Sequence, residues 1–190
     1  MPDVKCDGHY RDNSAACGEP FTEFAAFCRA APTGSALDLG CGQGRDALMF
    51  AREGHRVVGV DVSSVGVAQM LAIARSEDLD VEGSVQDIRT DRPDTIFDIV
   101  ILDRVLHMLD AADRLPLLAS ATRAVAPGGH LLVAEGPKGT KPVREALEAK
   151  RWTLPMATRN RLVARRPLAG AGGCHTPPDA PPPSSIEASA

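Results

Sequence analysis

Three glycines spaced two residues apart, directly after an apolar run, constrain this chain more than any other feature of its sequence. Gly40, Gly42 and Gly44 follow the run 36–39, and a second apolar run ends at Asp61. This order predicts a buried strand, a glycine-rich turn that opens a helix, and a second parallel strand. Glycine is needed where a ligand approaches the backbone, and an acid 21 residues beyond Gly40 can accept hydrogen bonds from ribose hydroxyls. The sequence therefore predicts an α/β fold that binds a nucleoside.

The spacing of the glycines narrows the kind of nucleoside. A dinucleotide site uses G-x-G-x-x-G, with the pyrophosphate on the helix N-terminus. Here the pattern is G-x-G-x-G, and Arg45 stands where a dinucleotide site has its third glycine. A short turn of this kind suits a ligand without a pyrophosphate. A nicotinamide-dependent oxidoreductase shares the strand, turn and acid but needs glycine at Arg45, so we regard it as the weaker alternative.

An alternating rhythm of strands and helices runs through most of the chain. We expect strands at 36–39, 57–60, 81–86, 97–102 and 130–134, and an antiparallel hairpin at 152–157 and 161–165. Helices are expected at 20–31, 44–53, 63–75, 103–125 and 142–149, with Pro116 tolerable only near a first turn. Residues 1–18 read as irregular. This pattern divides the chain into an N-terminal lid and helix segment (1–35), a central domain (36–166) and a tail (167–190).

Composition supports one cytoplasmic domain. The 190 residues are 44% hydrophobic, enough for a single core, and no run is long enough for a membrane span. The N-terminus lacks the pattern of a secretory signal, and five cysteines without pairing motifs favour a reducing compartment. Cys6, His9 and Cys17 match no standard zinc spacing, so no metal site is expected. The tail has six prolines in 24 residues and is expected to be disordered.

Charge is unevenly distributed along the chain. Residues 138–166 carry nine Lys and Arg against two Glu, whereas residues 1–137 are net acidic. A basic segment can meet an anionic substrate or a nucleic acid. Trp152 is the only nearby aromatic residue, too little for a base-stacking platform. We therefore interpret the basic segment as a solvated face and expect neither a nucleic-acid nor a membrane partner.

The segment Asp38-Leu39-Gly40-Cys41-Gly42-Gln43-Gly44-Arg45 resembles motif I of the class I S-adenosylmethionine (SAM)-dependent methyltransferases. The resemblance covers roughly residues 36–136, since 97–100 with Asp103 is similar to motif IV and 127–131 to the turn before the fifth strand. It implies a Rossmann-like, doubly wound sheet, mostly parallel, of about seven strands with a short C-terminal antiparallel hairpin. The cofactor implied is SAM, with S-adenosylhomocysteine as its product. The last helix and hairpin are short for the family, which leaves the far edge of the sheet in question.

The resemblance also implies roles for particular residues. Asp61 would bind the ribose, Val62 would contact the adenine face, and Asp87 and Ile88 would meet the adenine edge. The remaining residues expected at the cofactor are Asp38, Gly40, Gly42, Gly44, Arg45 and Asp103. Arg45 either pairs with the cofactor carboxylate or is a solvated first-turn residue, and Asp87 is either a ligand or a turn former. Tyr10 is either a lid over the cofactor or an exposed side chain.

Methyl transfer by this family is an in-line displacement, in which a nucleophile attacks the sulfonium methyl group. A general base is required only when the nucleophile carries a proton at neutral pH. His107 and Asp103 are the catalytic candidates, with Glu135 a third by position, although a lone histidine is often structural. The motif resembles small-molecule enzymes, including the tellurite-resistance type, so the expected partner is a small-molecule acceptor. The alternative is a SAM-binding regulatory or degenerate module with little catalysis. The sequence does not identify the acceptor or the oligomeric state.

Overall fold

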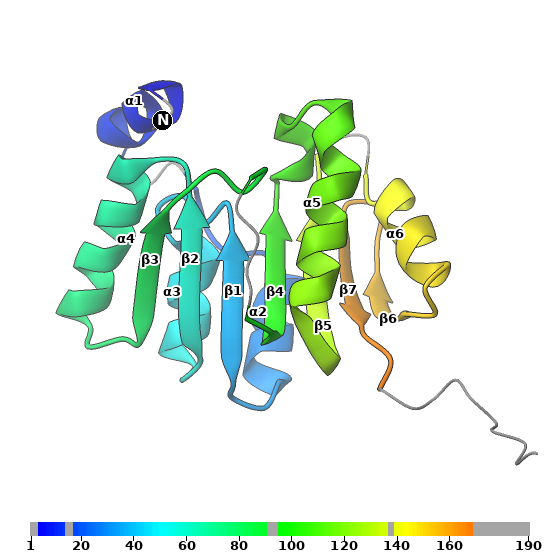
Figure 1. Ribbon diagram of the computed structural model, residues 1–190. Helices are drawn as coiled ribbons and strands as arrows, with labels where there is room; N and C mark the ends of the chain where they lie inside the picture. Colours follow the sequence, from blue (N-terminus) through cyan, green and yellow to red (C-terminus); the bar gives the residue numbers. More distant parts are fainter. Residues whose placement is uncertain (1–3, 14–16, 91–94, 137–138, 169–190) are drawn as a thin grey trace, which may run out of the picture.

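Seven strands form one sheet in the order β3-β2-β1-β4-β5-β7-β6 in the computed structural model (Figure 1). The structure describes residues 4–13, 17–90, 95–136 and 139–168. The first five strands are parallel, and β7 runs antiparallel to both β5 and β6. The strands are β1 (Ser35–Leu39), β2 (Arg56–Asp61), β3 (Val81–Val85), β4 (Phe97–Asp103), β5 (Val125–Ala134), β6 (Thr153–Ala157) and β7 (Arg161–Arg165). The hairpin therefore completes the sheet, and its far edge is no longer in question.

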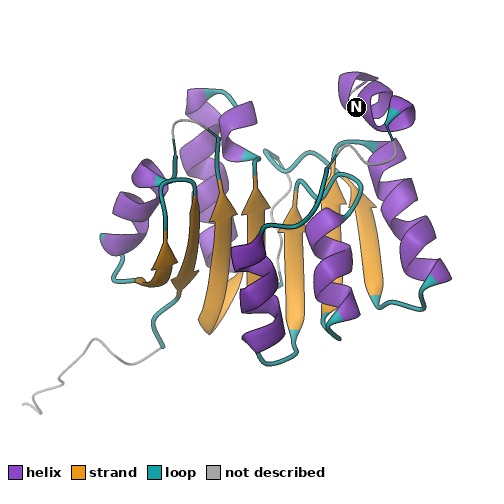
Figure 2. Cartoon of the chain, turned by 180° about the vertical axis from the view of Figure 1, so that it is seen from behind, coloured by secondary structure: helices purple, strands orange, loops and turns teal. Residues whose placement is uncertain are grey.

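Helices cover both faces of the sheet (Figures 1 and 2). One face carries α2 (Thr22–Ala30), α3 (Arg45–Arg52) and α4 (Ser64–Ser76), whose buried side chains share a core with β1 and β2. The other face carries α5 (Ala111–Ala124) and α6 (Lys141–Glu148). The N-terminal helix α1 (Val4–Asp12) lies against α4, and the 3₁₀ turn η1 (Leu106–Met108) lies between β4 and α5.

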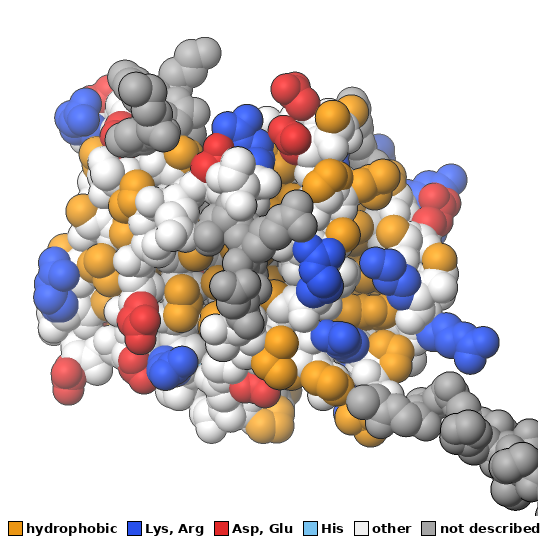
Figure 3. Space-filling view, viewed as in Figure 1, with side chains coloured by type: hydrophobic (Ala, Val, Ile, Leu, Met, Phe, Trp, Pro, Cys, Tyr) orange, Lys and Arg blue, Asp and Glu red, His pale blue; other side chains and the backbone are white. Residues whose placement is uncertain are grey.

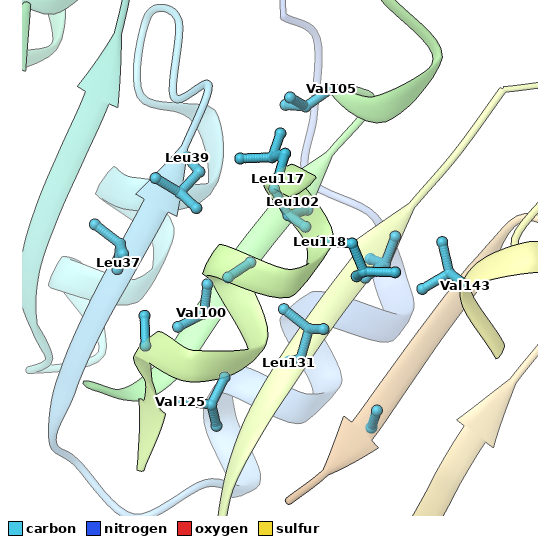
Figure 4. Packing of buried hydrophobic residues seen from close by; sticks show 14 of the residues in the cluster. Leu37, Leu39, Val100, Leu102, Val105, Leu117, Leu118, Val125, Leu131 and Val143 are labelled. Atoms are coloured by element: carbon cyan, nitrogen blue, oxygen red, sulfur yellow. The ribbon is translucent and has the colours of Figure 1, made fainter. Parts of the chain in front are cut away.

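The central strand β4 explains how both cores are filled. Its apolar side chains alternate between the two faces, because successive residues of a strand point to opposite sides. Val100 and Leu102 join the core under α5 (Figure 4), whereas Ile99 and Ile101 join the core under α2 and α3. All four are at most 2% exposed. A near-continuous apolar sequence is thus what a strand covered on both faces requires.

Strand register brings the carboxyl ends of four strands to one edge of the sheet. Leu39 pairs with Val60, next to Asp61, and Asp103 pairs with Ala134, next to Glu135. In open α/β sheets, ligands bind outside the carboxyl ends of the strands. The acids named from the sequence at 61, 103 and 135 therefore share the edge at which a site is expected.

Three expectations from the sequence are corrected by the structure. Residues 4–12 form α1 rather than irregular chain, because Asp7 holds the helix to α4 through hydrogen bonds that no local pattern reveals. Strand β5 begins at Val125, five residues early, through a bulge opposite Phe97 and Ile99. Glycine makes this bulge possible, since a Cβ at Gly129 would lie 2.6 Å from the Asp98 carbonyl oxygen.

The single helix expected at 103–125 is instead η1 followed by α5, which begins at Ala111. Pro116 lies in the second turn of α5 rather than the first. It removes only the hydrogen bond to the carbonyl of the residue four positions earlier, and the helix continues to Ala124 because Leu117, Leu118 and Ala121 are buried against the sheet.

Lys and Arg side chains are spread over the half of the molecule that carries α5, α6 and the β6–β7 hairpin (Figure 3). Trp152 is only 7% exposed, so its ring is not presented on this surface. Among the described residues, no helix is long and apolar enough to cross a membrane. The tail 169–190 lies outside the described residues.

Candidate cofactor and acceptor site

The glycine turn between β1 and α3 is folded back on the end of β2. The backbone N–H of Gly40 donates to the Val60 carbonyl at 2.7 Å, and that of Gly44 donates to the Cys41 carbonyl at 2.8 Å. Gly40, Gly42 and Gly44 all have positive φ, of 82°, 54° and 83°. Because L-residues with a Cβ rarely adopt this conformation, the turn depends on glycine at these positions.

Asp61 links the glycine turn to the start of α4. Its Oδ2 accepts a hydrogen bond from the Gly42 N–H at 2.8 Å, and its Oδ1 accepts one from the Ser63 N–H at 2.7 Å. Ser63 in turn caps α4 by accepting from the Gly66 N–H. Burial raises the pKa of the Asp61 carboxyl, while the two backbone donors act in the opposite direction. The carboxylate is thus fixed at the edge of the sheet, 7% exposed, as a preoriented acceptor.

Arg45 lies at the centre of a buried charge cluster. Its guanidinium pairs with Asp103, donates to Asp46 Oδ2 at 2.8 Å and donates to the Cys17 carbonyl at 3.0 Å. Its side chain is 7% exposed, and the ring of Phe21 lies 5.0 Å from it. Arg45 is therefore a buried ion-pair partner rather than a solvated residue of the first helical turn.

Asp38 serves the helix that follows the turn. Its Oδ2 accepts a hydrogen bond from the Ala47 N–H of α3 at 3.2 Å, and the residue is 2% exposed. Burial and the nearby carboxylate of Asp46 raise the pKa of Asp38 well above its ordinary value. Its carboxyl group thus ties the first turn of α3 to β1.

The residues expected at an adenine ring lie beside the end of β2. The Gln86 N–H donates to the Asp61 carbonyl at 3.0 Å, which holds the chain after β3 against Asp61. Asp87 is engaged by Arg89, whose guanidinium donates to Oδ1 at 2.9 Å and to Oδ2 at 2.6 Å. This pair lowers the pKa of Asp87. Ile88 packs on the core beneath α5, and Val62 is half-buried.

A second group of polar residues lies at the ends of β4 and β5. Glu135 Oε1 accepts from the Leu106 N–H at 3.2 Å, and Oε2 lies 3.3 Å from His107 Nδ1. The Glu135 side chain is 7% exposed and that of His107 is 37% exposed. Burial raises the pKa of Glu135, and His107 acts against that shift. The fold thus brings together the two candidates His107 and Glu135, whereas Asp103 turns to Arg45.

A cavity of about 390 Å³ adjoins Glu135. Its lining also includes Phe21 and the β6–β7 turn, namely Thr158, Arg159, Asn160 and Arg161. The turn is tied down because Asn160 Nδ2 donates to the carbonyls of Glu135 and Gly136. Phe21 falls within the helix expected at 20–31 and residues 158–160 within the expected hairpin, but the sequence did not identify either as part of a cavity. No local signal reveals them, since they meet only through the pairing of β7 with β5.

Helix α1 lies over the glycine turn and the start of α4. Asp7 accepts from the Ser63 hydroxyl at 2.6 Å and from the Val65 N–H at 3.2 Å. The Tyr10 hydroxyl is so close to Gly42 that a Cβ there would lie 2.5 Å from it. The N-terminal segment therefore covers one side of the turn.

Comparison with known proteins matches residues 36–129 to the methyltransferase domain family. Cypemycin N-terminal methyltransferase of a Streptomyces species is 38% identical over 95 residues, which cover 49% of this chain and 38% of that protein. 2-Heptyl-1-hydroxyquinolin-4(1H)-one methyltransferase of Mycobacteroides abscessus is 30% identical over 145 residues, which cover 69% of this chain and 64% of that protein.

The fold is shared with N-methyltransferase NodS of Bradyrhizobium japonicum, solved in complex with S-adenosylhomocysteine. The TM-score is 0.71 at 19% identity, and the match covers 87% of this chain and all of that one. This chain spans only 31% to 38% of the length of three curated relatives that it matches, so the activity of the whole protein does not follow from theirs.

Proposed function

The chain belongs to the class I SAM-dependent methyltransferases, and on that premise we propose that it transfers the methyl group of SAM to a small-molecule nucleophile. The observation that carries the proposal is the Asp61 carboxylate, held by the Gly42 and Ser63 amides at the carboxyl edge of the sheet. An acid in this position is suited to the two ribose hydroxyls of an adenosyl group.

The electrostatics of the edge fit a cationic cofactor. Asp46 and Asp103 are buried against one buried cation, Arg45, and Asp61 is buried at the same edge of the sheet. Asp46 Oδ1 accepts no hydrogen bond from the residues that the structure describes. A surplus of buried carboxylates stabilises positive charge, and SAM carries both a sulfonium and an ammonium group. The residues present therefore fit SAM better than they fit a dinucleotide, whose pyrophosphate is anionic.

We assign roles to the cofactor-binding residues on this basis. The glycines at 40, 42 and 44 give close access to the backbone, and Asp61 accepts from the ribose hydroxyls. Val62, Asp87 and Ile88 form the adenine side, with Asp87 leaving its pair with Arg89 when the ring is bound. Arg45 is already paired with Asp103 and Asp46. We therefore propose that it orients these two carboxylates toward the methionine part of SAM. Asp103 then acts as a binding residue rather than as a base.

When bound, the cofactor supplies an electrophilic methyl group on a positively charged sulfur. The chain contributes mainly alignment and exclusion of water. Phe21 is well placed for both, since its ring packs against Arg45 and Arg161 and lines the cavity beside Glu135. His107 remains the catalytic candidate, because its imidazole is partly exposed at the same edge.

A small-molecule acceptor is supported by the relatives and by the cavity. One relative is named for a hydroxyquinolone and several fold neighbours for other small molecules. A cavity of about 390 Å³ is of the size that holds such a compound. The alternative of a degenerate binding module was motivated by the short C-terminal hairpin. That motive disappears, because β6 and β7 complete the sheet and the turn between them lines the cavity.

Transfer of a labelled methyl group tests the proposal. The full chain is incubated with methyl-labelled SAM and a pool of small hydroxyl, amine and thiol compounds, and label in the organic fraction is measured. We expect transfer by the wild type and by Asp80→Asn, a matched change at an exposed aspartate at the opposite edge of the sheet. Asp61→Asn is expected to lose it. Absence of transfer from a chain that binds S-adenosylhomocysteine would favour the binding module.

A further inference from the structure

We infer that the acceptor loses a proton during methyl transfer, and that His107, positioned by Glu135, receives it. The acceptor is therefore a hydroxyl or N–H compound rather than a ligand already ionised at neutral pH. This inference rests on the proposed methyltransferase function and adds to it the chemical class of the substrate.

The two oxygens of Glu135 have separate tasks. Oε1 accepts from the backbone N–H of Leu106, at the start of η1, and Oε2 faces His107 Nδ1 at 3.3 Å. One carboxylate thus holds both the backbone and the side chain of η1. The orientation of His107 is therefore set from the end of β5, through the pairing of its imidazole with Glu135 Oε2 and the anchoring of the neighbouring Leu106 amide on Oε1.

This arrangement decides which nitrogen of His107 is available. A carboxylate beside Nδ1 favours the tautomer with the proton on Nδ1, which donates to Glu135. Nε2 is then left as the acceptor, and it has no hydrogen-bond partner within the part of the chain that the structure describes. The side chain is 37% exposed, so a ligand at the sheet edge can reach Nε2. Imidazole in this state is a general base, and the carboxylate stabilises the imidazolium that forms.

The pair lies close to the cofactor side of the fold. Val105, two residues before His107, packs against the glycine turn, since a Cβ at Gly40 would lie 2.4 Å from its side chain. Glu135 itself lines the cavity formed with Phe21 and the β6–β7 turn. His107 thus lies two residues from a side chain that touches the glycine turn, and its partner Glu135 lines the cavity.

The reaction then balances without any further reagent. The nucleophilic oxygen or nitrogen of the acceptor forms a bond to the methyl carbon as the carbon–sulfur bond breaks, and the electron pair of that bond stays on sulfur. The acceptor proton passes to His107 Nε2, and water later removes it. An ionised acceptor needs no such base, and a buried carboxylate beside the site would disfavour binding of an anion.

Two measurements test this inference. The first is the ¹⁵N spectrum of protein labelled at histidine, in which the His107 signals are assigned by their absence in His107→Gln. This measurement requires no acceptor. We expect the Nδ1–H tautomer in the wild type and loss of that preference in Glu135→Gln. A predominant Nε2–H tautomer of His107 in the wild type would overturn the inference. So would a tautomer ratio that Glu135→Gln leaves unchanged.

The second measurement compares two acceptor panels at saturating SAM. One contains phenols and N–H heterocycles, and the other contains thiophenolate and tellurite. We expect transfer to the first panel, reduced about 100-fold or more in kcat by His107→Gln and less by Glu135→Gln. Glu82→Gln, at an exposed glutamate on β3, serves as the matched control and is expected to leave kcat unchanged.

Calorimetric titration with S-adenosylhomocysteine separates the two ways of failing. If His107→Gln does not reduce transfer, or if only the ionised panel is methylated, the proposed acceptor class is wrong. Binding of S-adenosylhomocysteine in the same protein would show that the cofactor site is nevertheless present. A chain that binds the cofactor product yet methylates neither panel also contradicts the acceptor class. Loss of binding in the wild type would instead contradict the proposed function itself.

Discussion

The carboxylate of Asp61 accepts a 2.8 Å hydrogen bond from the backbone N–H of Gly42, 19 residues earlier in the chain. The bond joins the end of β2 to the turn after β1, and it fixes the acid before any ligand arrives. Preorganisation of this kind lowers the cost of binding, because the acceptor need not be ordered when the ligand enters. The same contact explains why turn and acid occur together at a set spacing.

Replacing Arg45 by Met is expected to destabilise the fold. The change leaves the buried carboxylates of Asp46 and Asp103 without their cation, and breaking a buried pair in this way costs about 3–5 kcal/mol. Urea denaturation followed by circular dichroism measures the loss. Arg52→Met, at an arginine whose ion pair with Glu77 is exposed, is the control and should cost less than about 1 kcal/mol. Equal effects of the two changes would contradict a central role for the Arg45 cluster.

The pKa of Asp38 predicts a pH dependence of stability. Burial raises that pKa, so between the ordinary carboxyl value and the raised one the folded chain keeps a proton that the unfolded chain has released. The free energy of unfolding contributed by Asp38 therefore falls as pH rises through this window and is lowest above it. Asp38→Asn removes the titration but keeps an acceptor for the Ala47 N–H. We expect the variant to gain stability relative to wild type as the pH is raised from the ordinary carboxyl pKa toward the raised pKa of Asp38.

Denaturation curves at several pH values measure this difference. Asp80→Asn, at an exposed aspartate, should show a constant difference from wild type across the same range. A difference between Asp38→Asn and wild type that is independent of pH would mean that Asp38 is charged in both the folded and the unfolded chain.

Asp7→Ala is expected to release α1 from α4. The carboxylate accepts from the Ser63 hydroxyl and the Val65 N–H, and these bonds are the main polar link between the two helices. We expect faster cleavage of the N-terminal segment in limited proteolysis and a lower melting temperature. Asp12→Ala, at an exposed position of the same helix, is the control. Unchanged proteolysis in Asp7→Ala would show that Asp7 does not hold the helix in place.

Most of the fold could be predicted from the sequence, because apolar periodicity reports directly on burial. The strand expected at 97–102 is present as β4, and its apolar side chains enter both cores. The hairpin at 152–157 and 161–165 was also predicted, and the structure places it at the edge of the sheet. Helix α1 was missed, since its stability comes from contacts between Asp7 and residues more than 50 positions away.

The candidate site was predictable only where spacing carries the information. Asp61 and the glycines have a fixed separation in sequence, and the structure joins them through the Gly42 amide. The contact between Glu135 and His107 depends on how β4 and β5 pair. The sequence could therefore place each residue near a strand end, but it could not predict that the two residues meet. The cavity wall at Asn160 depends in the same way on the pairing of β5 with β7.

Calorimetric titration of the full chain with S-adenosylhomocysteine, beside NAD and beside Asp61→Asn, tests the central claim most directly. The account predicts binding of S-adenosylhomocysteine and no binding of NAD. It also predicts affinity about 10-fold or more weaker in Asp61→Asn, since hydrogen bonds to a charged group contribute about 1.5–3 kcal/mol, with Asp80→Asn unchanged. Binding of NAD alone, or affinity for S-adenosylhomocysteine that is indifferent to Asp61→Asn, would contradict it.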